Sequence, residues 1–131
     1  MKHILHKELT NEIIGTYYDV YNEIGFGFSE KVYQNFLFFE LQSRGFSIEA
    51  QKQIHVYYKG RIVGEYYADI IVENKIILEL KAVNQLIDEH EFQLLNYLKA
   101  SKIEVGLLFN FGVNPDFKRI ILTNDRKPNL K

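Results

Sequence analysis

The stretch that decides how this chain folds is YYADIIVENKIILELKAV, residues 66–83. It consists of two apolar runs, residues 66–72 and 76–83, joined by the three polar residues 73–75. Apolar runs of this length, rich in Ile, Val and Tyr, are typical of strands in a sheet that is covered on both faces. A short polar connection between such runs predicts an antiparallel hairpin. We therefore expect two neighbouring strands here, from Arg61 to Val72 and from Ile76 to Val83.

Three charged residues, Asp69, Glu79 and Lys81, interrupt the apolar runs 66–72 and 76–83. Because side chains alternate along a strand, Glu79 and Lys81 share one face and Leu80 points to the other. A charge that projects from an apolar strand is unfavourable unless it is paired or bound to something. An ordinary Glu-Lys pair on a solvated face of the sheet is one interpretation. A site that binds a ligand is the other, and Asp69 favours it.

The length of the connection decides whether Asp69 faces Glu79. A three-residue loop, 73–75, pairs Val72 with Ile76, and so Asp69 with Glu79. A loop of only residues 74–75 pairs Asp69 with Leu80 and puts the two acids on opposite faces. The sequence leaves both registers open. In the first register the carboxylates repel each other, and a divalent cation such as Mg²⁺, which prefers carboxylate oxygens, would remove that repulsion.

Hydrophobic periodicity assigns the remaining elements on either side of this hairpin. Thr10, Ser29 and Asp88 are candidate N-caps, because their side-chain oxygens can accept from free N–H groups at a helix start. The other predicted elements are helices over 11–24, 29–44 and 88–101 and strands over 54–58, 105–111 and 120–123. The order is α-α-β-β-β-α-β-β. We therefore predict an α/β fold, a mixed β-sheet flanked by helices, as one domain over residues 1–131.

Composition narrows the class of protein further. The chain has 131 residues, 47% of them hydrophobic, and no cysteine. The lack of cysteine excludes disulfides, thiolate zinc sites and cysteine nucleophiles. No apolar run has the length of a signal peptide or a membrane span, so we expect a cytoplasmic location and no membrane partner. A formal net charge of −1 counts against a nucleic-acid binder that is basic all over.

Three motifs resemble a known group of nucleases. Asp69 followed by Glu79-Leu80-Lys81 is similar to the PD-(D/E)xK signature, although Ala68 stands where that signature has proline. Residues 27–33, GFSEKVY, match the Gly-x-x-Glu-x-x-Tyr motif of the GxxExxY family within that superfamily. Residues 93–97, QLLNY, look like the Gln-x-x-x-Tyr motif of RecB-like and lambda-exonuclease-like nucleases. The resemblance covers about residues 10–123.

The resemblance implies a restriction-endonuclease-like fold and metal-dependent hydrolysis of nucleic-acid phosphodiesters, with DNA as the expected substrate. The site residues that it implies are Glu30, Asp69, Glu79, Lys81, Gln93 and Tyr97. The implied ligands of Mg²⁺, or of Mn²⁺ in its place, are Asp69, Glu79, the Leu80 carbonyl and Glu30, the last either directly or through water. Lys81 would orient the attacking water, and Gln93 and Tyr97 would position it or a phosphate oxygen.

Simpler interpretations stand beside these assignments. Glu30 lies in the first turn of its helix, where the helix dipole favours an acid. Gln93 and Tyr97 lie four residues apart, so they share a face of their helix and could be its polar edge. A catalytically inactive module that binds nucleic acid or protein on the same fold is the alternative function. Because so small a nuclease often needs a second subunit to grip a duplex, a homodimer is also among the expected partners.

Overall fold

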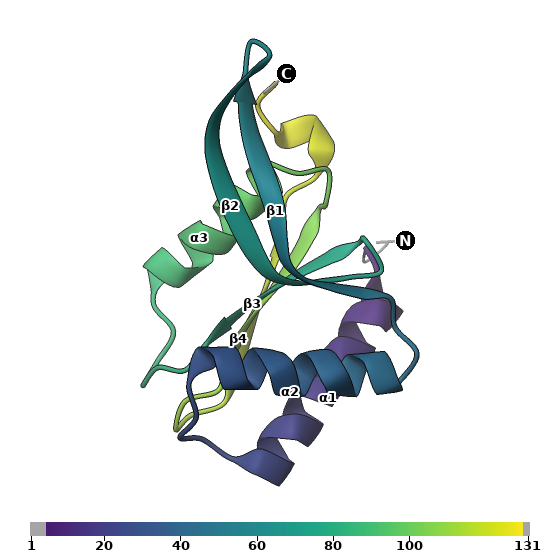
Figure 1. Cartoon of the computed structure of the whole chain (residues 1–131), viewed down its shortest axis with the longest axis vertical. Coiled ribbons are helices and arrows are strands. Elements are labelled where there is room, and N and C mark those ends of the chain that lie inside the picture. Colours follow the sequence, from purple (N-terminus) through teal and green to yellow (C-terminus); the bar gives the residue numbers. More distant parts are fainter. Residues whose placement is uncertain (1–4, 130–131) are drawn as a thin grey trace.

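The computed structural model describes residues 5–129 and contains one five-stranded sheet with helices on both of its faces (Figure 1). The helices and strands follow the predicted order α-α-β-β-β-α-β-β. The elements are α1 (Lys7–Ile24), α2 (Glu30–Ser43), β1 (Ile48–Tyr58), β2 (Arg61–Val72), β3 (Ile76–Lys81), α3 (Asp88–Lys99), β4 (Val105–Asn110), β5 (Asp116–Ile121) and the short 3₁₀ helix η1 (Asn124–Arg126). The outermost residues of the predicted domain, 1–4 and 130–131, lie outside the described part.

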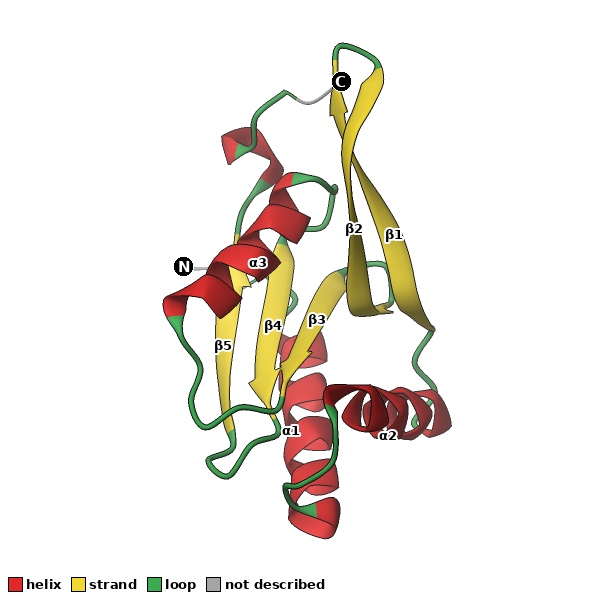
Figure 2. Ribbon diagram, turned by 60° about the vertical axis from the view of Figure 1, so that its left-hand side comes forward, coloured by secondary structure: helices red, strands yellow, loops and turns green. Residues whose placement is uncertain are grey.

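The sheet is mixed, as predicted, and its strands lie in the order β1-β2-β3-β4-β5. Only β3 and β4 run parallel, and α3 makes the crossover between them. Helix α3 lies on one face of the sheet and α1 on the other, with α2 packed beside α1 (Figure 2). Strand β3, which carries Glu79 and Lys81, is therefore the middle strand of the sheet and is covered on both sides.

The hairpin between β2 and β3 has the three-residue register. Val72 pairs with Ile76 and Ile70 with Leu78. Asn74 adopts a left-handed conformation with φ of 55° in this turn, which asparagine tolerates better than most residues. The alternative two-residue register, which would have separated Asp69 from Glu79, is wrong.

The core on the α1 and α2 side is rich in aromatic rings. Tyr17 of α1 stacks on Phe109 with ring centroids 4.3 Å apart, and Tyr33 of α2 stacks on Phe111 at 4.4 Å. Both tyrosines are fully buried, and each hydroxyl has partners. Tyr17 donates to the Asn110 carbonyl and accepts from the Asp116 N–H at 3.1 Å. This face of the sheet therefore buries its polar atoms only where they are hydrogen-bonded.

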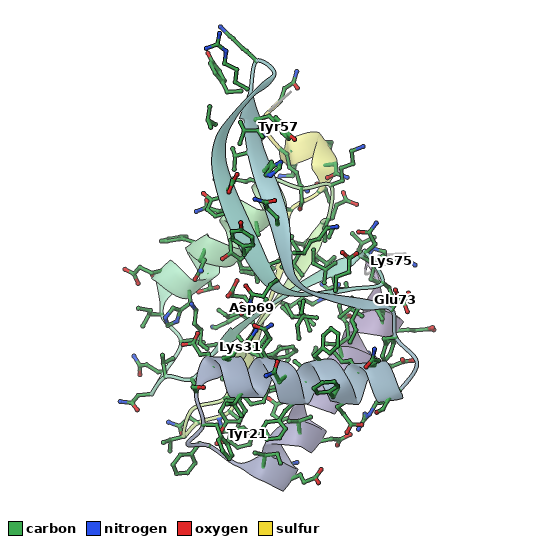
Figure 3. The ribbon with its side chains drawn as sticks, in the orientation of Figure 1. Tyr21, Lys31, Tyr57, Asp69, Glu73 and Lys75 are labelled. Atoms are coloured by element: carbon green, nitrogen blue, oxygen red, sulfur yellow. The ribbon has the colours of Figure 1, made fainter. Side chains whose placement is uncertain are left out.

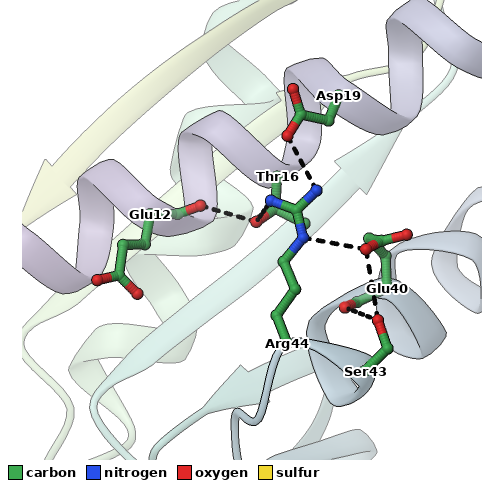
Figure 4. A network of polar contacts seen from close by, with 6 residues as sticks. All are labelled: Glu12, Thr16, Asp19, Glu40, Ser43 and Arg44. Atoms are coloured by element: carbon green, nitrogen blue, oxygen red, sulfur yellow. Dashed lines mark hydrogen bonds and ion pairs between the residues drawn. The ribbon is translucent and has the colours of Figure 1, made fainter.

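Arg44 joins the two helices at their outer surface (Figure 4). Its guanidinium donates to the Asp19 carboxylate at 2.9 Å and to the Thr16 hydroxyl at 3.0 Å, both on α1. It also donates to the Glu40 carboxylate of α2 at 3.0 Å. The network is partly exposed to solvent, so it orients the helices more than it stabilises them.

Two of the predicted N-caps are wrong. Helix α1 begins at Lys7, with His6 as the N-cap, so Thr10 lies inside it and its hydroxyl donates back to the His6 carbonyl at 2.8 Å. Helix α3 has Ile87 as its N-cap, and the Ile87 N–H donates to His90 Nδ1 at 3.1 Å. The N-terminus of α3 is thus capped by the His90 side chain and not by Asp88. Ser29 is at the N-cap position of α2, as predicted, but its side chain makes no capping hydrogen bond.

Strand β1 is longer than the predicted strand over 54–58. It begins at Ile48, because Ile48 and Ala50 pair with the end of β2. With β2 it forms a long hairpin that extends beyond the other strands (Figure 1). Strand β5 also begins earlier than the predicted residue 120, at Asp116, where it pairs with Asn110.

Candidate active site

Asp69 and Glu79 lie next to each other on the α3 face of the sheet. The backbone ladder between β2 and β3 extends as far as the pair Ile70–Leu78. One residue further on, the Asp69 carboxylate accepts the Leu80 N–H at 2.8 Å and so continues the connection with its side chain. Its carboxyl group is close enough to Glu79 to raise the pKa of that acid. Figure 3 shows Asp69 near the base of the β1–β2 hairpin.

Glu79 is a buried acid with an unsatisfied oxygen. Its side chain is only 3% exposed, and its Oε2 has no hydrogen-bond partner among the described residues. Burial raises the pKa of Glu79 to about 9, and the neighbouring Asp69 carboxyl adds to the rise. Buried polar atoms without a partner are rare in proteins. The Glu79 carboxyl is therefore in an environment that favours either a proton or a bound cation.

Lys81, Gln93 and Tyr97 form a hydrogen-bonded chain beside these acids. The Lys81 ammonium donates to Gln93 Oε1 at 2.9 Å, and Gln93 Nε2 donates to the Tyr97 hydroxyl at 2.8 Å. Burial raises the pKa of Tyr97 to about 12, with the nearby Glu79 as the next cause. The amide of Gln93 thus links the ammonium to the phenol, and the phenol lies near the Glu79 carboxyl. Tyr97 keeps its proton at neutral pH.

Three elements bring these five side chains together, and Asp69 comes from β2. Glu79 and Lys81 alternate with Leu80 on β3 and so point toward α3. Gln93 and Tyr97 are one helical turn apart on α3 and point back toward the sheet. The ring of Tyr66, from β2, packs against Tyr97 with centroids 5.2 Å apart and supports it from the side. Of the six predicted site residues, the structure joins all but Glu30 through these contacts.

Glu30 is exposed in the first turn of α2. In both ribbon views this turn lies beside the end of β3, the end that carries Lys81 (Figures 1 and 2). Among residues 5–129, however, no group of three or more His, Cys, Asp or Glu side chains is placed to hold a metal ion. The role of Glu30 stays a prediction.

Tyr33, the last residue of the Gly-x-x-Glu-x-x-Tyr motif, has a clear structural function. Its hydroxyl donates to the Gly25 carbonyl at 2.5 Å and accepts the Phe28 N–H at 3.2 Å. It therefore fixes the loop that precedes α2. Gly27 in this loop has a φ of 120°, a backbone conformation that residues other than glycine rarely adopt. The motif thus sets the position of the first turn of α2, where Glu30 lies.

Asn110 is a buried residue that the sequence reasoning missed. Its amide donates to the Val83 carbonyl at 2.9 Å, and its Oδ1 accepts from the N–H groups of Val83 and Gly112, each at 3.0 Å. It thereby fixes the chain just after Lys81, the residue that pairs with it in the sheet. A lone amide at the end of an apolar strand was the signal for it. Gly112 is required there, because a Cβ would lie 1.8 Å from the Val83 oxygen.

The donor set around Glu79 fits a hard divalent cation. Two carboxylates supply oxygen ligands, which Mg²⁺ prefers, and Mg²⁺ usually binds through one or two protein carboxylates and keeps several waters. The unpartnered Oε2 of Glu79 gives such an ion a ligand that is free of other bonds. Asp69 and Glu79 would hold it, and the ion would offset their mutual repulsion.

Comparison with known proteins identifies the family. The family model of the PD-(D/E)XK nuclease superfamily matches residues 7–120. No curated protein matches the sequence. The structure is similar to one described as "Crystal structure of SSO0001", with a TM-score of 0.60 and 22% identity.

The structural match covers 74% of this chain and 52% of the other, so this chain spans about half of that protein's length. At this identity the likeness shows a shared fold. The sequence match is to the superfamily as a whole, and membership of the narrower GxxExxY family stays a prediction. The family match, which spans nearly the whole chain, establishes that the chain belongs to the PD-(D/E)XK nuclease superfamily.

Proposed function

We propose that this chain is a metal-dependent nuclease that hydrolyses phosphodiester bonds of DNA. One observation carries the proposal: the buried Glu79 carboxyl has an unsatisfied oxygen and lies beside Asp69, with the Lys81 ammonium on the same face. Membership of a nuclease superfamily supports the same conclusion from an independent direction. The specific choice of DNA rests on the sequence resemblance.

Asp69 and Glu79 are the ligands we propose for Mg²⁺ or Mn²⁺. The Leu80 carbonyl is a suitable third oxygen, because the N–H and C=O of one strand residue point to the same side and the Leu80 N–H points at Asp69. Glu30 is proposed as a more distant ligand that acts through water. A bound divalent ion would polarise the phosphate and lower the pKa of a water molecule.

Lys81 is the residue that we propose to orient the attacking water. Its hydrogen bond to Gln93 holds the ammonium on the side of the acids, and Gln93 is itself fixed by Tyr97. The ammonium can donate to the water or to a phosphate oxygen and can offset the negative charge that develops there. Gln93 and Tyr97 hold the ammonium in place for this contact, and they are also proposed to position the water or a phosphate oxygen.

A nuclease assay tests this function. Purified protein is incubated with labelled single-stranded and double-stranded DNA and RNA, each with Mg²⁺, Mn²⁺ or EDTA. We expect cleavage of DNA with either ion, none with EDTA, and a loss of at least 100-fold in Lys81→Ala. Lys75→Ala, which removes an exposed lysine from the β2–β3 turn, is the matched control and should cut at the normal rate.

Three results would contradict the proposal. Cleavage in EDTA, or at an unchanged rate in Lys81→Ala, would remove the proposed site from the reaction. Tight binding of nucleic acid without cleavage under any condition would support the inactive binding module instead. The predicted homodimer is measured in the same preparation by sedimentation equilibrium, with and without DNA.

No helix within residues 5–129 has the length and apolarity required to cross a membrane.

A further inference from the structure

The hairpin formed by residues 53–67 projects away from the rest of the sheet (Figures 1 and 2), and we refer to it as the arm. Strand β1 pairs only with β2, and β2 pairs with β3 only at residues 70–72. The arm is therefore a two-stranded ribbon with no third strand beside it. Its turn, Lys59-Gly60, has positive φ at both residues, as in the tight turns that suit β-hairpins.

Each face of the tip of the arm carries an exposed aromatic or β-branched side chain. Tyr57 pairs with Ile62 and Tyr58 with Arg61, and successive pairs point to opposite sides of a ribbon. The side chains of Tyr58 and Ile62 are 55% and 51% exposed, so the rest of the described chain leaves both faces open. A two-stranded ribbon has little stability of its own in water. Exposed apolar side chains on such an element indicate a surface that contacts a partner.

The charge of the tip indicates the chemistry of that partner. Residues 54–64 at the tip contain Lys59 and Arg61 and no acid, and the acid of the arm, Glu65, lies nearer its base and pairs with His55. The whole chain, in contrast, has a net charge of −1. The Lys59 ammonium lies 5.1 Å from the centre of the Tyr58 ring, where a cation is attracted to the π face. The arm therefore combines cations with aromatic and β-branched side chains, which is the pattern expected for contacts to phosphates and bases.

The position of the arm connects it to the candidate active site. Tyr67, half exposed near the base of the arm, is two residues before Asp69 on the same strand. Arg61 at the tip is eight residues before Asp69. At about 3.3 Å per strand residue this separation is about 26 Å, which is about eight base pairs of duplex. A nucleic acid with a phosphate at Asp69 would have the tip beside it roughly eight base pairs away.

We propose that the arm binds duplex DNA by lying in its major groove, with Lys59 and Arg61 on the phosphates at its tip. The major groove is wide enough to admit a two-stranded ribbon, and the exposed Tyr58 and Ile62 side chains would face base edges there. The inference rests on the proposed function, because it names the form of DNA that the site would act on. One chain would then hold a duplex without a second subunit.

A binding experiment in EDTA tests the arm apart from hydrolysis. Fluorescence anisotropy measures the affinity of the full chain for a labelled 24-base-pair duplex at several salt concentrations. We expect the double variant Lys59→Gln/Arg61→Gln to bind at least tenfold more weakly. The slope of log affinity against log salt should fall by about two, because two phosphate contacts are lost. A duplex of six base pairs should bind the variant and the normal chain equally.

The double variant Lys75→Gln/Lys118→Gln is the matched control. It removes the same charge from the β2–β3 turn and from β5, the strand at the opposite edge of the sheet, and it should bind like the normal chain. All four positions are exposed, so thermal melting should be unchanged in both variants and confirm that they fold.

Three outcomes would overturn the inference. They are equal affinity of the arm variant and the control, equal affinity of the normal chain for a single strand and a duplex, and an arm variant that loses self-association instead of DNA binding. Because no step requires hydrolysis, a chain that binds through the arm but never cuts would contradict only the proposed function. A chain that cuts normally after loss of both arm charges would contradict only the arm.

Discussion

The two faces of strand β3 differ in how they treat buried polar atoms. On the α1 and α2 side, Leu78 and Leu80 enter an apolar core in which the buried hydroxyls of Tyr17 and Tyr33 are hydrogen-bonded. On the α3 side, the same strand presents Glu79, whose Oε2 has no partner within residues 5–129. The buried hydroxyls on the first face are thus hydrogen-bonded, whereas the second face has a buried carboxyl oxygen without a hydrogen-bond partner.

This difference assigns separate roles to the two faces of β3: the α1 and α2 face stabilises the fold, and the α3 face carries the candidate site. Burial of apolar area and satisfied hydrogen bonds stabilise the fold. A buried acid that lacks a partner destabilises it, and such residues are concentrated at functional sites. We therefore expect substitutions on the first face to lower stability and some substitutions on the second face to raise it.

The largest stability effect is expected for Leu78→Ala. Leu78 is fully buried in the larger core, so its truncation removes apolar contacts and leaves a cavity, which costs about 2–5 kcal/mol. Urea denaturation of the metal-free protein measures this loss. If the loss is below about 1 kcal/mol, the first face does not hold the fold together in the way described.

Glu79→Gln should have the opposite sign. The amide carries no charge, so the metal-free protein should gain on the order of 2 kcal/mol in its free energy of unfolding at pH 8. Leu80→Ala, on the other face of the same strand, is the matched comparison and should lose stability. A loss of stability in Glu79→Gln would contradict the claim that the buried Glu79 carboxyl destabilises the metal-free protein.

The pH dependence of stability is a second test of whether the Glu79 carboxyl destabilises the metal-free protein. The pKa of Glu79 rises from 4.5 to about 9 on folding, so between these values the unfolded chain is ionised while the folded chain holds its proton. The folded state therefore binds more protons, and this group makes the metal-free protein less stable as pH rises from about 4.5 to 9. Glu79→Gln should remove that part of the slope. Parallel curves for the two proteins would show that Glu79 titrates normally.

Tyr17→Phe tests the α1 and α2 face of the sheet by the removal of one buried hydroxyl. It removes a hydroxyl that accepts from the Asp116 N–H and donates to the Asn110 carbonyl, and it leaves both backbone groups without that partner. We expect a loss of about 1–3 kcal/mol, measured by thermal and urea denaturation. Tyr18→Phe, a less buried tyrosine of the same helix, should lose less. Equal losses would mean that the buried hydroxyl has no special role.

Arg44→Gln should have the smallest effect. The Arg44 side chain is 38% exposed, and its partner Asp19 is 62% exposed. Ion pairs with this exposure are worth about 0–1 kcal/mol. We expect a loss in that range, reduced further at high salt because exposed charges are screened. A loss above 2 kcal/mol would show that the packing of α1 on α2 depends on this network.

The sequence predicted the order of the elements because each element is either a short continuous apolar run or a run with helical period, and turn residues separate them. It left the register of Asp69 open, because loops of two and three residues are both compatible with residues 73–75, and the pairing of Val72 with Ile76 decides it. Thr10 was misassigned because the rule for N-caps uses residue type alone. The structure starts that helix earlier, after His6 with its left-handed φ of 54°.

The candidate site was predictable in part. Gln93 and Tyr97 were found through a motif, and the structure adds their bonds to each other and to Lys81. Asn110 was missed because its partners come from loops that sequence periodicity does not place in space. The arm was missed because periodicity cannot show that a predicted hairpin has no neighbour. Contacts between distant segments require the fold itself.

A cation site formed by the acids Asp69 and Glu79 is the central feature of the proposed function. Isothermal titration calorimetry of Mn²⁺ into the metal-free protein tests this without any substrate. We predict saturable binding that is lost in Asp69→Asn and retained in Asp125→Asn, which changes an exposed acid of η1. The absence of saturable binding, or equal binding by Asp69→Asn and the unmodified chain, would contradict the account.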